Sequence, residues 1–190
     1  MRKVIAKKIK GVVLVTAFAM TILVAGCATS EDNGWRNKLA SELPVLGHRN
    51  WILIADSAYP AQSRAGIETI ATGADQIEVV KTVLGAVDNT KHVRATVYLD
   101  AEMKYVPEKD APGINAYRKE LTALLGKREV KQVSHEELIA RLDEAAKTFR
   151  ILIFKTELTL PYTSVFLELD CGYWSLEAEQ KLRRAIQRSK

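Results

Sequence analysis

The chain has 190 residues, of which 28 are basic and 23 acidic. Five of the basic residues lie within the first ten, so the chain from residue 27 onward carries 23 basic and 23 acidic residues. A protein that binds nucleic acid by neutralising phosphates needs a basic surface, and this balance excludes one. The two cysteines and three histidines offer neither a disulfide framework nor a zinc site of the Cys/His type.

The N-terminus has the three parts of a secretory signal. A basic segment precedes an apolar run over residues 12–24, and small residues lead directly to Cys27. The run is shorter than the ~20 residues that span a bilayer, which favours a signal peptide over residues 1–26 rather than a membrane helix. The ending LVAGC resembles a bacterial lipobox. This implies a lipoprotein of the cell envelope, anchored through acyl chains such as palmitate on Cys27, at the periplasmic face of the outer membrane if the organism has one.

Residues 27–36, the lipidated cysteine and a polar tether, are expected to precede a single domain over residues 37–190. The strands alternate with helices, which predicts an α/β domain of three layers, a central sheet with helices on its faces. The patterns leave the strand order open. The expected elements are helices over 35–46, 76–87, 114–126, 135–149 and 175–189, and strands over 51–55, 92–99, 128–133, 150–154 and 164–169.

Two helix starts carry capping-box patterns. Asp75 precedes Glu78 by three residues, and Ser134 precedes Glu137 by three, the spacing at which a side chain caps the first helical turn. His135 therefore falls in the first turn of its helix, where the positive helix end disfavours the imidazolium.

Several polar side chains stand beside predicted strands. His48 and Asp56 bracket the strand 51–55, and Tyr162 and Ser164 precede the last strand. Each also has a purely structural interpretation: a histidine after glycine can cap a helix end, an aspartate after a strand can close a turn, and a tyrosine after proline can pack in a turn. The three tryptophans are assigned to packing.

Three segments together resemble the RbsD/FucU family of D-ribose pyranases and L-fucose mutarotases. These segments are LGHRNWILIADSAYPAQS at 46–63, VSHEEL at 133–138 and LPYTSVFLEL at 160–169. They occur in the family's order and at roughly its spacing. The resemblance implies an RbsD-like domain and a ring-like homo-oligomer in which a neighbouring subunit completes each site.

The resemblance also implies residue roles. His48 matches the proton donor, while Asp56, His135 and Tyr162 match residues that bind the sugar. Ser164 stands where the family has asparagine, and this departure, with mixed ribose-branch and fucose-branch features, leaves the identity of the sugar open. No metal, nucleotide or redox cofactor is expected, because the sequence has no glycine-rich phosphate loop and the reaction needs only acid–base groups.

The sequence thus predicts a lipid-anchored mutarotase or pyranase that interconverts cyclic forms of a free monosaccharide such as fucose or ribose. Two alternatives remain: a non-catalytic sugar-binding lipoprotein, and a structural envelope lipoprotein that reuses the fold.

Overall fold

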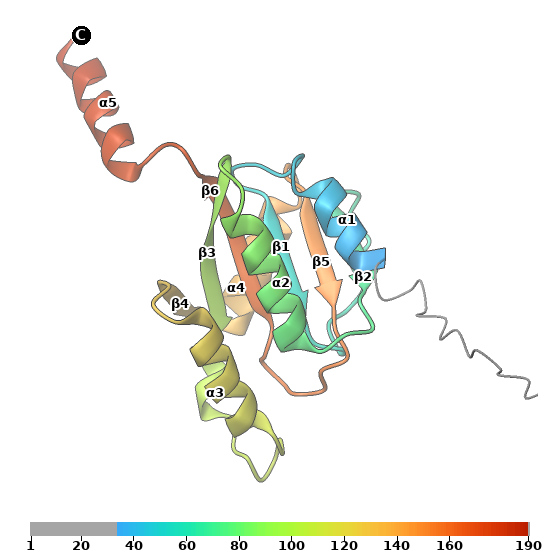
Figure 1. Cartoon of the computed structure of the whole chain (residues 1–190). Coiled ribbons are helices and arrows are strands. Elements are labelled where there is room, and N and C mark those ends of the chain that lie inside the picture. The colour runs from blue at the N-terminus through green and yellow to red at the C-terminus, as the bar shows by residue number, and fades with distance from the viewer. Residues whose placement is uncertain (1–33, 190) are drawn as a thin grey trace, which may run out of the picture.

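The structure, a computed structural model, describes residues 34–189, which form a six-stranded sheet with helices on both faces (Figure 1). Helices α1, α2 and α3 pack on one face and α4 on the other, which confirms the predicted three-layer α/β/α architecture. The elements in chain order are α1 (Gly34–Glu42), β1 (Trp51–Ala55), β2 (Ile67–Ala71), α2 (Gln76–Asp88), β3 (Val93–Asp100), the 3-10 helix η1 (Ala101–Tyr105), α3 (Ile114–Leu125), β4 (Val130–Val133), α4 (His135–Ala145), β5 (Ile151–Lys155), β6 (Val165–Cys171) and α5 (Leu176–Arg188).

The direction of the strands gives the sheet two different edges. The strand order is β2-β5-β1-β6-β3-β4, and only β6 runs antiparallel to its neighbours, β1 and β3. The other five strands therefore end at the same edge, where β6 begins. We call this the carboxyl edge and the opposite one the amino edge.

Strand β1 is buried on both faces, which explains its continuous apolar sequence WILIA. Ile52 and Ile54 enter the core beneath α1, α2 and α3, whereas Leu53 enters the core beneath α4 and joins Leu138 there. Full burial of each such side chain contributes about 1.5–3 kcal/mol. This burial fixes the register of β1, because a slip by one residue would exchange the two faces, and it places Asp56 at the carboxyl edge.

Most of the predicted elements are confirmed within a few residues, including both caps. Asp75 accepts hydrogen bonds from two backbone N–H groups of α2, and Ser134 accepts one from the N–H of Glu137 in α4. Two helices are shorter than predicted, since α1 ends at Glu42 and α4 at Ala145. Strand β2 was not predicted: it is a half-exposed edge strand, so its sequence IETIA lacks the apolar pattern of a buried one.

The C-terminal helix α5 stands away from the rest of the protein (Figure 1). None of its residues is buried, and Leu176, Leu182 and Ile186 are exposed. Among residues 34–189, no helix combines the length and hydrophobicity that a membrane span requires. The predicted signal peptide and the lipidation site Cys27 lie outside the described residues.

One buried polar network ties α2 to the loop before β6. The amide of Gln76 is fully buried; it donates to the hydroxyl of Tyr117 at 2.8 Å and to the backbone carbonyl of Thr163, and it accepts from the hydroxyl of Thr156 at 2.9 Å. Tyr117 also donates to the Thr163 carbonyl, at 2.8 Å. The network therefore holds the loop between β5 and β6 against α2 and α3.

Replacing Gln76 by leucine should destabilise the fold strongly. The substitution keeps a similar volume but removes the three hydrogen bonds of the Gln76 amide, with the Tyr117 hydroxyl, the Thr163 carbonyl and the Thr156 hydroxyl. At the net worth of a typical intramolecular hydrogen bond, their loss costs about 2–4 kcal/mol in total. We expect the melting temperature to fall by about 5–15 °C, measured by circular dichroism. The control is Gln180→Leu, the same change on the exposed surface of α5; equal losses in both variants would contradict the role of the network.

Candidate functional site

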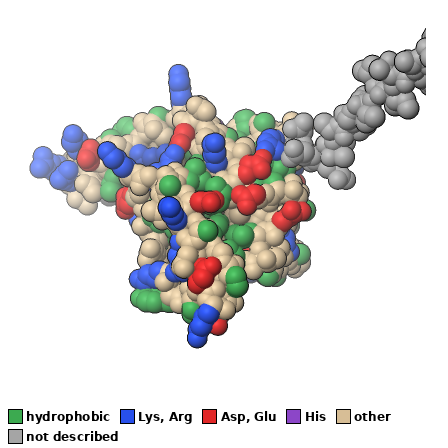
Figure 2. Space-filling model, turned by 60° about the horizontal axis from the view of Figure 1, so that its bottom comes forward, with side chains coloured by type: hydrophobic (Ala, Val, Ile, Leu, Met, Phe, Trp, Pro, Cys, Tyr) green, Lys and Arg blue, Asp and Glu red, His purple; other side chains and the backbone are tan. Residues whose placement is uncertain are grey.

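Four of the five predicted site residues lie at the carboxyl edge of the sheet. Asp56 follows β1, His135 opens α4 directly after β4, and Tyr162 and Ser164 belong to the loop that leads into β6. Figure 2, which turns this end of the molecule toward the viewer, shows acidic side chains beside apolar ones. Residues from three separate parts of the chain thus meet at one edge because their strands end or begin there.

Direct contacts link these residues around the loop before β6. The hydroxyl of Ser164 donates to the Oδ2 atom of Asp56 at 3.2 Å, while Oδ1 of Asp56 accepts from the backbone N–H of Ala58 at 2.9 Å. The rings of His135 and Tyr162 lie edge to face with their centroids 5.6 Å apart. Tyr162 and Ser164 therefore connect the carboxylate on one side of the site to the imidazole on the other.

Asp100, the last residue of β3, was not predicted as a site residue, and it holds His135 in place. Oδ1 of Asp100 lies 3.1 Å from Nδ1 of His135, and the carboxylate of Glu102 accepts from the backbone N–H of His135 at 3.1 Å. With Nδ1 donating to Asp100, Nε2 of His135 becomes the acceptor of the neutral ring. The sequence did contain a signal for Asp100: it comes directly after the predicted strand 92–99, just as Asp56 comes directly after the strand 51–55.

Burial changes the acidity of Asp100. Its side chain is inaccessible to solvent, and no partner satisfies its Oδ2 atom. Desolvation raises the pKa of Asp100 to about 6, although His135 opposes this effect, and the nearby charges of Glu102 and Asp56 add to it. A carboxyl group with a pKa near neutrality is typical of sites that move protons.

Two residues beside or within the predicted site have a strained backbone, one at each edge of the sheet. Tyr162 has φ 57° and Arg49, which follows His48, has φ 74°. These are the only non-glycine residues with positive φ between residues 34 and 189. Side chains other than glycine adopt this region at a cost, and such residues cluster at functional sites. Tyr162 is also 41% exposed, so its ring is open to a ligand.

The structure does not bring His48 together with the other four residues. His48 lies at the amino edge, where its Nδ1 atom is 2.8 Å from Oδ1 of Asp170 and its Nε2 atom accepts from Nε of Arg49 at 3.2 Å. The length of β1, five residues or roughly 15–20 Å, separates it from Asp56. Within one subunit, the predicted proton donor and the predicted sugar-binding residues therefore face opposite edges.

Asp170 binds several groups beside His48. Its carboxylate also pairs with Arg94 at 2.5 Å and accepts from the backbone N–H of Cys171 at 2.8 Å. Partial burial alone would raise the pKa of Asp170, but the hydrogen bonds from Arg94, Cys171 and His48 outweigh it and hold the pKa below its usual value. An ionised Asp170 favours the His48 tautomer that carries its proton on Nδ1. In the part of the chain that the structure describes, no group of three His, Cys, Asp or Glu side chains is arranged to hold a metal ion.

The chain belongs to the RbsD/FucU transport protein family, whose model matches residues 34–170. Among curated proteins, none matches the sequence significantly. The structure of Bacillus subtilis RbsD complexed with D-ribose is 22% identical with a TM-score of 0.50, over 70% of this chain and 91% of that one. At 22% identity, this similarity shows that the two proteins share a fold.

Two further solved structures are similar over the same share of this chain. The fucose mutarotase of Streptococcus pneumoniae in complex with L-fucose is 19% identical, with a TM-score of 0.47 over 70% of this chain and 91% of that one. FucU from Bifidobacterium longum is also 19% identical, with a TM-score of 0.46 over 70% of this chain and 94% of that one.

The raised pKa of Asp100 predicts a stability loss between pH 4 and pH 7. The folded protein keeps Asp100 protonated up to about pH 6, whereas the unfolded chain ionises near pH 4. The folded state therefore binds more protons in this window, and its free energy of unfolding falls as the pH rises. Between pH 4 and pH 7, the free energy of unfolding of the wild-type protein should fall by about 2–3 kcal/mol relative to that of Asp100→Asn, which cannot ionise at this position.

Urea denaturation at pH 4, 5, 6 and 7 measures this difference. Asp110→Asn, which removes an exposed aspartate from the loop before α3, controls for the loss of a carboxylate. A constant difference between wild type and Asp100→Asn across these pH values would contradict the assignment.

Proposed function

We propose that this protein interconverts the cyclic forms of a free monosaccharide by acid–base catalysis, as a mutarotase- or pyranase-like protein. The observation that carries the proposal is the meeting of Asp56, His135, Tyr162 and Ser164 at the carboxyl edge of a chain of the RbsD/FucU family. The D-ribose bound to the Bacillus subtilis relative supports a monosaccharide as the ligand.

The reaction requires two proton transfers. The anomeric hydroxyl loses its proton, the bond between the anomeric carbon and the ring oxygen breaks, and the ring oxygen gains a proton; closing the ring on the other face reverses these steps. In our proposal, Nε2 of neutral His135 takes the first proton and Asp56 orients the sugar hydroxyls. Tyr162 donates to, or stacks beneath, the sugar. Positioned acids and bases of this kind accelerate proton transfer by about 10²–10⁴-fold.

In our proposal, His48 in its protonated form, held through Nδ1 by Asp170, gives the proton of Nε2 to the ring oxygen and reaches this site from a second copy of the chain. Its distance from Asp56 along β1 rules out contact within one subunit, so catalysis by both residues requires a homo-oligomer in which an amino edge faces a carboxyl edge. Such a head-to-tail contact closes into a ring when the rotation between subunits permits it.

A sugar-binding protein without turnover is the second candidate. Ser164 replaces the asparagine of the family, and its hydrogen bond to Asp56 engages an oxygen that would otherwise hold only the sugar. This contact favours a site in which Asp56 orients the sugar hydroxyls less firmly than catalysis requires. The two candidates differ in whether bound sugar exchanges its anomers faster.

Anomer-exchange NMR with D-ribose and L-fucose tests the proposal. The wild-type protein should accelerate exchange, and His48→Ala, Asp56→Asn and His135→Gln should each reduce the acceleration by about 10²-fold or more. Binding of a sugar without faster anomer exchange would contradict the enzyme and support the non-catalytic sugar-binding protein. If the protein neither binds a sugar nor accelerates exchange, the remaining interpretation is a structural protein that reuses the fold.

Mixing variants tests whether the site is shared between subunits. After subunit exchange, equal amounts of His48→Ala and Asp56→Asn should regain about one quarter of the wild-type activity, because that share of interfaces pairs two intact halves. The matched control mixes Asp56→Asn with His135→Gln, which damage the same half of the site and should regain nothing. Recovery in neither mixture would contradict a shared site.

We also propose that the protein is a lipoprotein anchored to a membrane of the cell envelope through Cys27, with its signal peptide removed. The lipobox-like segment LVAGC supports this proposal. Cells fed an alkyne analogue of palmitate should label the wild-type protein and the control Cys171→Ser, whereas Cys27→Ser should lose the label and keep its signal peptide. Label that persists on Cys27→Ser would contradict lipidation at this residue.

A further inference from the structure

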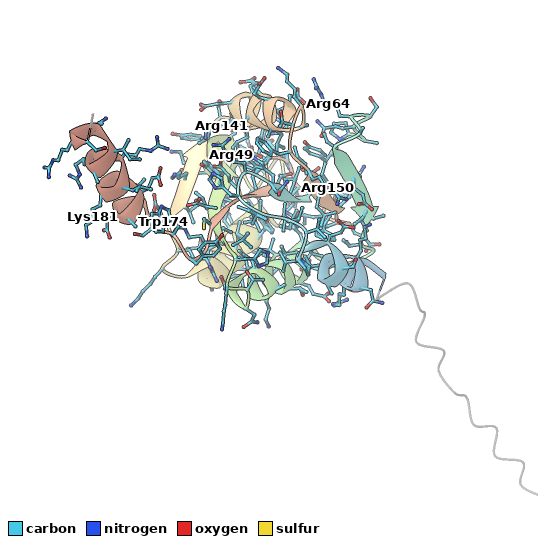
Figure 3. The ribbon with its side chains drawn as sticks, turned by 90° about the horizontal axis from the view of Figure 1, so that it is seen from above. Arg49, Arg64, Arg141, Arg150, Trp174 and Lys181 are labelled. Atoms are coloured by element: carbon cyan, nitrogen blue, oxygen red, sulfur yellow. The ribbon has the colours of Figure 1, made fainter. Side chains whose placement is uncertain are left out.

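The amino edge carries a cavity of about 430 Å³ that lies between α5 and the end of β6. Small-molecule sites typically enclose about 300–1,000 Å³, so the cavity is large enough for a small ligand. His48, Arg94 and Asp170 line one side, and Trp174, Glu179 and Arg183 line the other. Figure 3, which looks onto this edge, shows Trp174 at the junction of α5 with the body of the protein.

The two sides of the cavity differ in origin. The family model matches residues up to 170, so it includes His48, Arg94 and Asp170 but not the segment that supplies Trp174. The segment after β6, residues 172–189, therefore adds a wall to a surface that the matched part of the chain already presents. None of the residues of α5 is buried, so packing against the domain core does not account for the extension.

Trp174 is held in a fixed orientation rather than lying loosely on the surface. Its indole N–H donates to Oε2 of Glu179 at 2.9 Å, and Oε1 of Glu179 pairs with Nε of Arg183 at 2.7 Å. The ring remains 43% exposed. A preorganised, accessible aromatic face binds a partner at a low cost in conformational entropy.

The charges of the cavity favour an uncharged ligand. Arg94 pairs with Asp170, and Arg183 pairs with Glu179, so the two guanidinium groups balance the two carboxylates. An anionic or cationic ligand would find no surplus of opposite charge, whereas a neutral ligand rich in hydroxyl groups finds both donors and acceptors. The face of the Trp174 indole is negative, and it therefore attracts the weakly positive C–H groups on one face of a sugar ring.

We propose that this cavity binds a neutral saccharide, with one sugar ring stacked on Trp174 and its hydroxyls bound by Arg94 and Asp170. The inference is linked to the proposed function through His48, which lines this cavity and also serves the shared site. Trp174 is then a residue that selects the sugar, supplied by a segment beyond the residues that the family model matches.

Tryptophan fluorescence of the full-length protein in detergent tests the proposal directly. Of the three tryptophans, Trp174 lines the cavity, whereas Trp35 and Trp51 are buried at 2% and 4% exposure and do not line it. A change in emission that Trp174→Phe abolishes therefore comes from Trp174. Titration with L-fucose, D-ribose or maltose should give a saturable change in emission for at least one sugar. D-Ribose 5-phosphate should bind no better than D-ribose; tighter binding of the phosphate would overturn the neutral assignment.

Calorimetric titration of variants completes the test. Trp174→Ala should weaken binding of the sugar by 10-fold or more, and Trp174→Phe, which keeps an aromatic face, should weaken it less. Tyr173→Ala is the matched control, because Tyr173 is the neighbouring exposed aromatic residue and does not line the cavity. Equal binding by wild type and Trp174→Ala would overturn the proposal.

Anomer exchange measured on the same samples separates this inference from the proposed function. Binding that depends on Trp174 without accelerated exchange supports the cavity and contradicts the enzyme. Accelerated exchange with the same KM in Trp174→Ala and no change in emission supports the enzyme and contradicts the cavity.

Discussion

The buried amide of Gln76 is the contact on which the candidate site depends most. It joins the start of α2 to the end of β5, to α3 and to the carbonyl of Thr163. Thr163 lies between Tyr162 and Ser164, so the same hydrogen bond that satisfies a buried carbonyl also fixes the two side chains beside it. Because an unmade hydrogen bond costs more in the interior than at the surface, the loop has one strongly favoured position.

The antiparallel direction of β6 is the second constraint. It lets the residues before β6 join those that follow β1 and β4 at the carboxyl edge, while the residues after β6 reach the amino edge beside His48. One strand therefore connects two sites: Ser164, the residue before it, donates to Asp56, and Asp170, near its end, contacts His48. This division makes assembly of several copies a chemical requirement of the proposed reaction.

At both edges a histidine is held through Nδ1 by an aspartate, His135 by Asp100 and His48 by Asp170. The environments of the two aspartates differ. Asp100 is buried and its pKa is raised to about 6, whereas Asp170 is hydrogen-bonded by Arg94 and its pKa is lowered. Two similar pairs thus differ in the pH at which the aspartate ionises, because one aspartate is desolvated and the other is matched by a cation.

The sequence by itself determined the α/β class, most element positions, the N-cap residues Asp75 and Ser134 and the family. Hydrophobic periodicity and capping depend on residues close together in the chain. It did not determine which predicted site residues meet. Asp56 and Ser164 are 108 residues apart, His48 and Asp170 are 122 apart, and Asp100 and His135 are 35 apart. Only the order and direction of the strands decided these contacts, since both depend on pairing between distant segments. The burial that shifts the pKa of Asp100 and the placement of His48 at the opposite edge follow from the same tertiary arrangement.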